Sequence, residues 1–166
     1  MIEIPSSVMT QMQDHAFAWY PGECCGLLFA KTGDVASRAV CVDNLADKYH
    51  QLDPKEFPRT ARDAFKMNEA KVGKLVAEAK LQGERWLSVF HSHIDCDAYF
   101  SGEDIFMAAP TGVPNEPELW HVVMACYGTG AKAGEIRIAR AFKWDGKEFA
   151  GRDLPGFARK HPGKKP

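Results

Sequence analysis

Hydrophobic and polar residues alternate in blocks along the chain, and the spacing within each block separates helices from strands. Apolar residues at helical spacing predict a first helix over residues 6–19, which Pro21-Gly22 would stop. A second amphipathic helix is predicted from Asp53-Pro54, an N-cap followed by proline at the first helical position, to about Gln82. A shorter helix is predicted over residues 101–109.

Apolar runs with a period of two predict strands between and after these helices. The predicted strands cover residues 23–30, 35–42, 86–93, 119–127, 135–144 and 147–149. Residues 44–55 are predicted as a loop. The strand at 135–144 places apolar side chains on one face, which Arg140 interrupts. Because helices flank the strands along the sequence, we expect an α/β protein whose mixed sheet is covered by helices.

Length and composition agree with one domain. The chain has 166 residues, of which 45% are hydrophobic and 26% charged, so it is large enough for a sizeable core and short for two domains. We expect a single domain over residues 1–150. Proline, glycine and lysine become frequent after Gly151, so residues 151–166 are predicted as a flexible C-terminal tail.

The overall charge and hydropathy exclude several classes of partner. With a formal net charge of −1, the chain has no basic field for nucleic acid or an anionic membrane surface. No apolar run approaches the roughly 20 residues that cross a bilayer, and the N-terminus lacks the features of a signal peptide. We therefore expect a cytoplasmic protein. The pattern does not determine its oligomeric state.

The five cysteines include no C-x-x-C pair, and their odd number does not support a disulfide framework. We expect all of them to be reduced. Cys25, Cys41 and Cys126 lie among apolar strand residues and are predicted as small core groups. Cys96 is predicted to lie in a loop, where a metal ligand, a substrate contact and an oxidation-sensitive thiol are alternatives to an ordinary loop residue.

The candidate chemistry begins at His91 and His93, which end an apolar strand and project to the same face because they are two residues apart. Ser101 is a good N-cap residue, and Asp104 falls in the first turn of the helix that Ser101 would start. Two imidazoles and one carboxylate suit a catalytic zinc ion, which leaves a fourth position for water. The pattern is therefore typical of a metallohydrolase.

Other interpretations remain open at the level of spacing. Alternate histidines on a strand are more often core or surface groups, and Ser101 and Asp104 can simply cap a helix. Asp95, Cys96 and Asp97 are competing ligands, because they follow the second histidine and His₂Cys or His₂Asp sets are chemically reasonable. Spacing alone does not choose among these sets.

The order His91-x-His93, seven residues, Ser101, two residues, Asp104 resembles the JAMM signature of the MPN-domain zinc peptidases. The upstream segment Pro21-Gly22-Glu23-Cys24-Cys25-Gly26 is similar to the strand that carries the catalytic glutamate of that family. The resemblance covers residues 2–149 and implies a three-layer helix/mixed-sheet/helix core of the cytidine-deaminase-like type. Ile94 departs from the pattern, since many bacterial members have proline there.

The resemblance also implies a role for each motif residue. It implies that His91, His93 and Asp104 bind Zn²⁺, which activates water. Glu23 is then the general base that takes a proton from this water and delivers it to the leaving amine. Ser101 is the hydrogen-bond donor to the oxyanion of the substrate.

Small bacterial members of this family process ubiquitin-like or sulfur-carrier proteins at a C-terminal glycine. The resemblance therefore implies a zinc peptidase or isopeptidase whose partner is the C-terminal tail of such a carrier. An extended tail can add to an exposed strand, and residues 44–57 are a candidate cover for it. A metal-free MPN scaffold and a phage tail-assembly peptidase are alternatives, whereas a zinc nucleobase deaminase would need an H-x-E and P-C-x-x-C signature that is missing.

Overall fold

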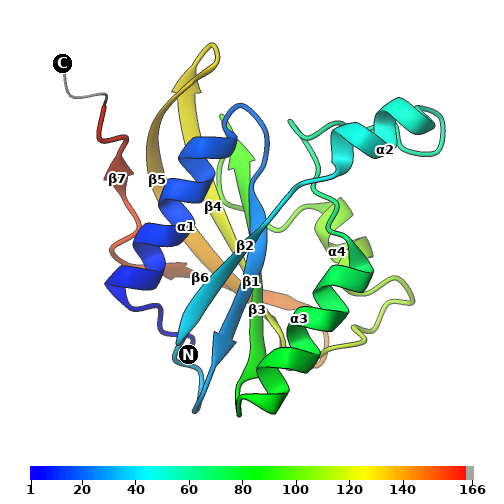
Figure 1. The fold of residues 1–166 in the computed structure, drawn as a ribbon, viewed down its shortest axis with the longest axis vertical. Coiled ribbons are helices and arrows are strands. Elements are labelled where there is room, and N and C mark those ends of the chain that lie inside the picture. The colour runs from blue at the N-terminus through cyan, green and yellow to red at the C-terminus, as the bar shows by residue number, and fades with distance from the viewer. Residues whose placement is uncertain (164–166) are drawn as a thin grey trace.

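The computed structural model describes residues 1–163 and contains a mixed β-sheet with helices on both of its faces (Figure 1). The seven strands follow the order β2-β1-β3-β4-β5-β6, with β7 paired to β5. Among the named strand pairs of the described chain, only β3 and β4 run parallel. No described helix has the length and hydropathy needed to cross a membrane. The elements are α1 (Ser6–Trp19), β1 (Cys25–Ala30), β2 (Arg38–Val42), α2 (Ala46–Leu52), α3 (Glu69–Leu81), β3 (Arg85–Ile94), α4 (Gly102–Ala108), β4 (Trp120–Thr129), β5 (Lys132–Trp144), β6 (Phe149–Leu154) and β7 (Arg159–Lys160).

Helices α1 and α3 cover opposite faces of the sheet. Met12 of α1 packs in a buried apolar cluster with Leu28 of β1 and Phe90 of β3. On the other face, Leu27 of β1 packs in a second cluster with Val76 of α3. Leu27 and Leu28 belong to different clusters because successive side chains of a strand point to opposite faces. The predicted three-layer α/β fold is therefore confirmed.

The helix boundaries differ from the prediction between residues 44 and 68. Helix α2 lies within the predicted loop, and α3 begins at Glu69, where the Asn68 side chain accepts a backbone hydrogen bond of 2.9 Å as N-cap. Asp53 instead accepts hydrogen bonds from the backbone N–H groups of Lys55 and Glu56. The predicted start at Asp53-Pro54 is wrong because an aspartate before proline can satisfy a turn as well as a helix N-terminus.

The C-terminal segment also differs from the predicted flexible tail. Strand β6 pairs with β5 over Ala139–Trp144, and β7 pairs with an earlier part of β5. Between them, Phe157 is 1% exposed, and its carbonyl accepts a hydrogen bond of 3.0 Å from the buried amide of Gln13. The frequent proline, glycine and lysine residues of this segment favour disorder. The segment is nevertheless ordered, because the open edge of β5 supplies backbone hydrogen-bond partners, which amino-acid composition does not reveal. The last residues of the predicted tail, 164–166, lie outside the described residues.

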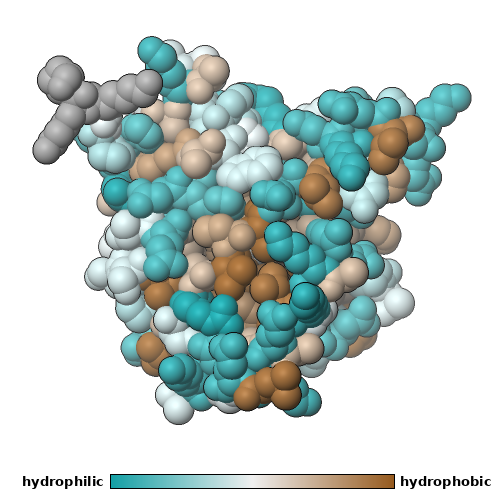
Figure 2. All heavy atoms as spheres, viewed as in Figure 1, coloured by the Kyte–Doolittle hydropathy of each residue, from teal (hydrophilic) through white to brown (hydrophobic). Residues whose placement is uncertain are grey.

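Strand β2 is an edge strand, and its outer side is only partly covered. Cys25 and Cys126 are buried as predicted, but Cys41 of β2 is exposed, so its assignment to the core is wrong. Figure 2 shows hydrophobic residues in a hollow between α1 and α3, where β1 and β2 lie, with hydrophilic surface around it. Alternating apolar residues indicated a strand in this region but not its position at an edge.

Gly26 of β1 is required by the close approach of β2 and β3. A Cβ atom at this position would lie 2.4 Å from the ring of Phe90 and 2.6 Å from the carbonyl oxygen of Val40. We expect Gly26→Ala to lower the free energy of unfolding by about 1–3 kcal/mol, the usual cost of overpacking. Urea denaturation of the purified variant measures this change.

Gly73 on α3 provides a matched control, because nothing lies within 4 Å of a Cβ atom built there. Alanine is favoured over glycine inside a helix by about 1 kcal/mol, so Gly73→Ala should be neutral or stabilising. Equal stability of the Gly26→Ala variant and the unmodified chain would show that β1 can move away from Phe90 at little cost.

Candidate metal centre

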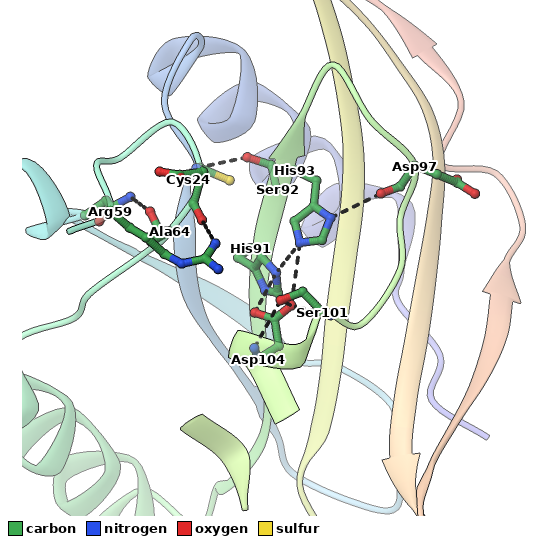
Figure 3. Close-up of polar contacts among 11 residues, drawn as sticks. Cys24, Arg59, Ala64, His91, Ser92, His93, Asp97, Ser101 and Asp104 are labelled. Atoms are coloured by element: carbon green, nitrogen blue, oxygen red, sulfur yellow. Dashed lines mark hydrogen bonds and ion pairs between the residues drawn. The ribbon is translucent and has the colours of Figure 1, made fainter. Parts of the chain in front are cut away.

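The end of β3 and the first turn of α4 bring three side chains to one point. The Nε2 atoms of His91 and His93, at alternate positions of β3, lie 3.2 Å apart. Asp104 of α4 places one carboxylate oxygen 3.3 Å from Nε2 of His91 and the other 3.6 Å from Nε2 of His93. All three side chains are buried, and Figure 3 shows them pointing toward one another.

These separations suit a metal ion. Two ligand atoms bound tetrahedrally to zinc, each at about 2.0–2.1 Å, are about 3.3–3.4 Å apart. The two histidine nitrogens, 3.2 Å apart, and the His91–Asp104 Oδ1 pair, 3.3 Å apart, are close to that value, and the other oxygen of Asp104, Oδ2, lies 3.6 Å from His93. Two imidazoles and a carboxylate also form a donor set that divalent transition metals favour. His91, His93 and Asp104 could therefore hold a metal ion, as the motif predicted.

The hydrogen bonds around His93 and the packing of His91 orient their rings. Nδ1 of His93 lies 3.1 Å from the carbonyl oxygen of Asp97, so this nitrogen carries the ring proton and the lone pair of Nε2 faces the centre. Phe65 stacks on His91 with ring centroids 4.5 Å apart. Burial lowers the pKa of His91, although its hydrogen bond with Asp104 opposes this effect. The neutral form of His91 that a metal requires is thus favoured.

Ser101 and Asp104 form a reciprocal cap at the start of α4. The backbone N–H of Asp104 donates to Oγ of Ser101 at 3.1 Å, while the N–H and hydroxyl of Ser101 donate to Oδ2 of Asp104 at 2.8 and 2.6 Å. Burial would raise the pKa of Asp104, but the neighbouring imidazoles of His91 and His93 and the hydrogen bonds from Ser101 outweigh it and hold the pKa well below its usual range. Ser101 therefore caps the helix and also orients the ionised carboxylate of Asp104.

Glu23 lies just before β1, and its backbone is held by hydrogen bonds to two other segments of the chain. Its backbone N–H donates to the carbonyl of Ala61 at 2.6 Å, and its own carbonyl accepts from Nδ2 of Asn44 at 2.9 Å. The next residue, Cys24, donates its N–H at 2.9 Å to Oγ of Ser92, which lies between the two histidines (Figure 3). Strand pairing thus places Glu23 beside the histidines, although 68 residues separate Cys24 from Ser92.

The carboxyl group of Glu23 has a strongly shifted pKa. Burial raises the pKa of Glu23 to about 9, the nearby carboxylates Asp104 and Asp63 act in the same direction, and Arg59 opposes them. The residue is 5% exposed. A cation nearby favours the ionised form of a carboxyl group, so metal binding would bring this pKa down. Such environment-dependent protonation is typical of catalytic acids and bases.

Two cavities meet at this centre. They share Glu23, His93 and Ser101 in their walls. The first has a volume of about 390 Å³, and its further lining includes the large side chains of Tyr49, Phe57, Phe65, Phe106 and Met107. The second has a volume of about 450 Å³ and a more polar lining that includes Thr60, Arg62, Cys96 and Tyr99. An extended chain crossing from one cavity to the other would pass Glu23 and Ser101.

The alternative ligands after His93 have other partners. Asp95 accepts a hydrogen bond of 3.0 Å from the hydroxyl of Tyr20, and Asp97 accepts one of 2.9 Å from Arg140. Cys96 lines the second cavity at intermediate exposure and is not among the grouped ligand atoms of the described residues. The structure therefore favours Asp104 over all three alternatives that spacing left open.

Sequence patterns missed Asn44, whose side-chain amide joins separate segments of the site. In addition to the carbonyl of Glu23, it donates to the carbonyl of Ala64 at 2.9 Å, and its oxygen accepts from the N–H groups of Ala46 and Lys66. An asparagine after a strand signals a turn, such as its bond to Ala46, but the other three partners lie 20 to 22 positions away along the chain. No local pattern connects them.

Residues 5–144 match the family described as prokaryotic homologs of the JAB domain. A solution structure of a protein from Desulfitobacterium hafniense is similar, with a TM-score of 0.60 and 21% identity over 93% of this chain and 90% of that chain. A crystal structure of a JAB1/MPN domain protein from Archaeoglobus fulgidus aligns with a TM-score of 0.47 and 13% identity, over 92% of this chain and 94% of that chain. No curated protein matches the chain.

Proposed function

The chain belongs to the family of prokaryotic homologs of the JAB domain, and from this premise we propose that it is a zinc-dependent peptidase. The JAB/MPN family includes metallohydrolases. The observation that carries the proposal is the convergence of His91, His93 and Asp104 on one buried point, with Glu23 lining the same cavity as His93 and Asp104. This arrangement joins a metal-binding set to a carboxyl group that can exchange a proton.

The mechanism assigns a separate task to each side chain. A divalent ion held by His91, His93 and Asp104 supplies water activation near neutral pH. Glu23 takes one proton as water attacks the carbonyl carbon and returns this proton to the nitrogen of the leaving amine when the C–N bond breaks. The carboxylate is thereby regenerated. The hydroxyl of Ser101, which donates to Oδ2 of Asp104 in the free protein, would turn its single proton to the oxygen of the attacked carbonyl while negative charge develops there.

We propose that the substrate is the C-terminal tail of a ubiquitin-like or sulfur-carrier protein, cleaved after its last glycine. The first cavity supports this, because its aromatic and apolar walls can enclose an extended chain that leads to Glu23. Tyr49 and Phe57 come from the segment that the sequence suggested as a cover. Nδ1 of His50 lies 2.8 Å from the carbonyl oxygen of Phe57, so this histidine helps to shape the segment.

The test is hydrolysis of a fusion in which a ubiquitin-like protein ending in Gly-Gly is followed by a short peptide. We expect protein purified with Zn²⁺ to release the peptide, and removal of the metal by a chelator to stop the release until Zn²⁺ is restored. Protein that binds no zinc and leaves the fusions intact would contradict the proposal and favour a binding module.

Ser101→Ala is expected to reduce turnover by about 10²- to 10³-fold, as for other lost oxyanion donors, while zinc stays bound. The variant also loses the cap of α4, which costs about 1 kcal/mol of stability. Ser101→Thr is the matched control, because threonine keeps a hydroxyl and is also a good cap. Turnover numbers and zinc content of both variants separate the two roles. Full activity of Ser101→Ala would remove Ser101 from the mechanism.

A further inference from the structure

Arg140 places a positive charge on the face of the sheet that also carries His91 and His93. It pairs in register with Val123 of β4, which pairs with His91 of β3, so the three residues form one row across the sheet. Residues opposite each other in neighbouring strands lie on the same face. On this face of β5, Ile138 and Phe142 pack in an apolar cluster. The guanidinium of Arg140 therefore emerges on the same side of the sheet as the candidate metal centre.

The hydrogen bonds of Arg140 fasten the loop after β3 to strands β5 and β6. Nη1 donates to Oδ2 of Asp97 at 2.9 Å and to the carbonyl oxygen of Ala98 at 3.1 Å. Nε donates to Asp153 of β6 at 2.8 Å. One planar group thus fixes two consecutive loop residues from a strand that does not itself pair with β3.

The loop that Arg140 holds is the one that orients His93. The chain turns at Asp95, which has a φ of 57°, in the left-handed region that non-glycine residues rarely adopt. After this turn the carbonyl oxygen of Asp97 lies 3.1 Å from Nδ1 of His93 (Figure 3). Ala98, the next residue, is fully buried. The position of this carbonyl therefore depends on how the segment Asp97-Ala98 is held.

We propose that Arg140 is a positioning residue for the metal ligand His93, acting through Asp97 and Ala98. The inference rests on the proposed metal site and deepens it. The bond to the Asp97 carbonyl keeps the ring proton of His93 on Nδ1, so Nε2 presents its lone pair to the metal. Without Arg140, the carbonyl group of Asp97 is held less firmly, and the imidazole ring of His93 is therefore less well oriented.

If Arg140 acted only through its charge, its removal would change the affinity for metal in the opposite direction. A measurement of metal affinity can therefore distinguish the two roles. A guanidinium near the site repels a divalent cation, so removal of its charge would strengthen metal binding. Loss of a group that orients a metal ligand instead weakens binding, by about 10- to 100-fold in other metal sites. The sign of the change distinguishes a positioning role from a simple charge effect.

The experiment is a zinc titration against a competing chromophoric chelator, for the full chain and its variants. We expect Arg140→Leu to bind Zn²⁺ about 10- to 100-fold more weakly than the unmodified chain. Arg140→Lys keeps the positive charge but lacks the planar guanidinium, so its affinity for Zn²⁺ should lie between those of the unmodified chain and Arg140→Leu. Arg137→Leu is the matched control, because Arg137 lies on the same strand and pairs with Glu135 at 2.7 Å. It should bind as the unmodified chain does. Equal or tighter binding by Arg140→Leu would overturn the inference.

A measurement without metal separates this inference from the proposed function. ¹⁵N spectra of the imidazoles in metal-free protein at pH 8 report which nitrogen of His93 carries the proton. We expect the Nδ1–H form in the unmodified chain and in Arg137→Leu, and a mixture of both forms in Arg140→Leu. If the chain bound no zinc, this difference would still support the role of Arg140 while the peptidase proposal failed. The same spectrum for all three proteins would overturn the role of Arg140.

Discussion

Glu23→Gln is expected to reduce hydrolysis of the ubiquitin-like fusion by about 10²- to 10⁴-fold, the usual contribution of a general acid–base group. The amide has nearly the same shape but cannot take a proton from water at neutral pH. The backbone hydrogen bonds of Glu23 to Ala61 and Asn44 do not involve its side chain, so the local structure should persist. Initial rates of peptide release measure the loss.

Zinc content is the control for this variant. Glu23 is not in the group formed by His91, His93 and Asp104, so Glu23→Gln should bind the same amount of metal as the unmodified chain. A fully active Glu23→Gln protein would exclude Glu23 as the proton acceptor. An inactive protein without zinc would instead indicate that Glu23 helps to hold the metal.

The same substitution should change the pH dependence of stability in metal-free protein. Burial raises the pKa of Glu23 to about 9 in the folded chain, against an ordinary value near 4.5. Between these values the folded chain holds a proton that the unfolded chain releases, so the stability of the unmodified chain decreases as pH rises. Glutamine does not titrate. Glu23→Gln should therefore melt at least about 2 °C higher at pH 8, a shift that about 1 kcal/mol produces in a chain of this size.

Melting at pH 4 tests whether this stabilisation comes from the buried charge. Glu23 is protonated in the folded chain there, and mostly protonated in the unfolded chain, so the two proteins should melt at nearly the same temperature. A constant difference at all pH values would mean that packing or hydrogen bonding causes it.

Asp104→Ala is expected to abolish zinc binding and, with it, hydrolysis. The substitution removes one of three ligands and should weaken binding by more than about 100-fold, the upper range for loss of an outer partner alone. It also removes the acceptor of two hydrogen bonds from Ser101. Metal analysis after gel filtration and a zinc titration measure the loss.

Asp104→Asn separates metal binding from the structure of α4. Its side-chain oxygen can still accept from the N–H and hydroxyl of Ser101, so the start of the helix should be retained, whereas the negative charge of the ligand is lost. We expect both variants to lose zinc and only Asp104→Ala to melt at a clearly lower temperature without metal. Retention of zinc by Asp104→Ala would place the metal elsewhere.

Much of the candidate site was predictable because its parts are local. His91 and His93 end one apolar strand, and Ser101 and Asp104 form a cap whose hydrogen bonds join residues three apart. Helix and strand periodicity describe such features directly. The start of α3 was not predictable in this way, because the turn at Asp53 and the cap at Asn68 compete as local solutions. The surrounding structure decides between them.

The sequence by itself determined a candidate metal-binding set, since two histidines, a serine and an aspartate at these spacings define a strand end, a helix cap and three metal-ligand types. Only the tertiary structure decided which carboxylate lies against the two histidines, because Asp97 and Asp104 both follow them in the sequence. It also decided that Glu23 and Arg140 lie on either side of these residues. Their positions depend on pairing among β1, β3, β4 and β5, and such long-range contacts leave no periodic signal in the chain.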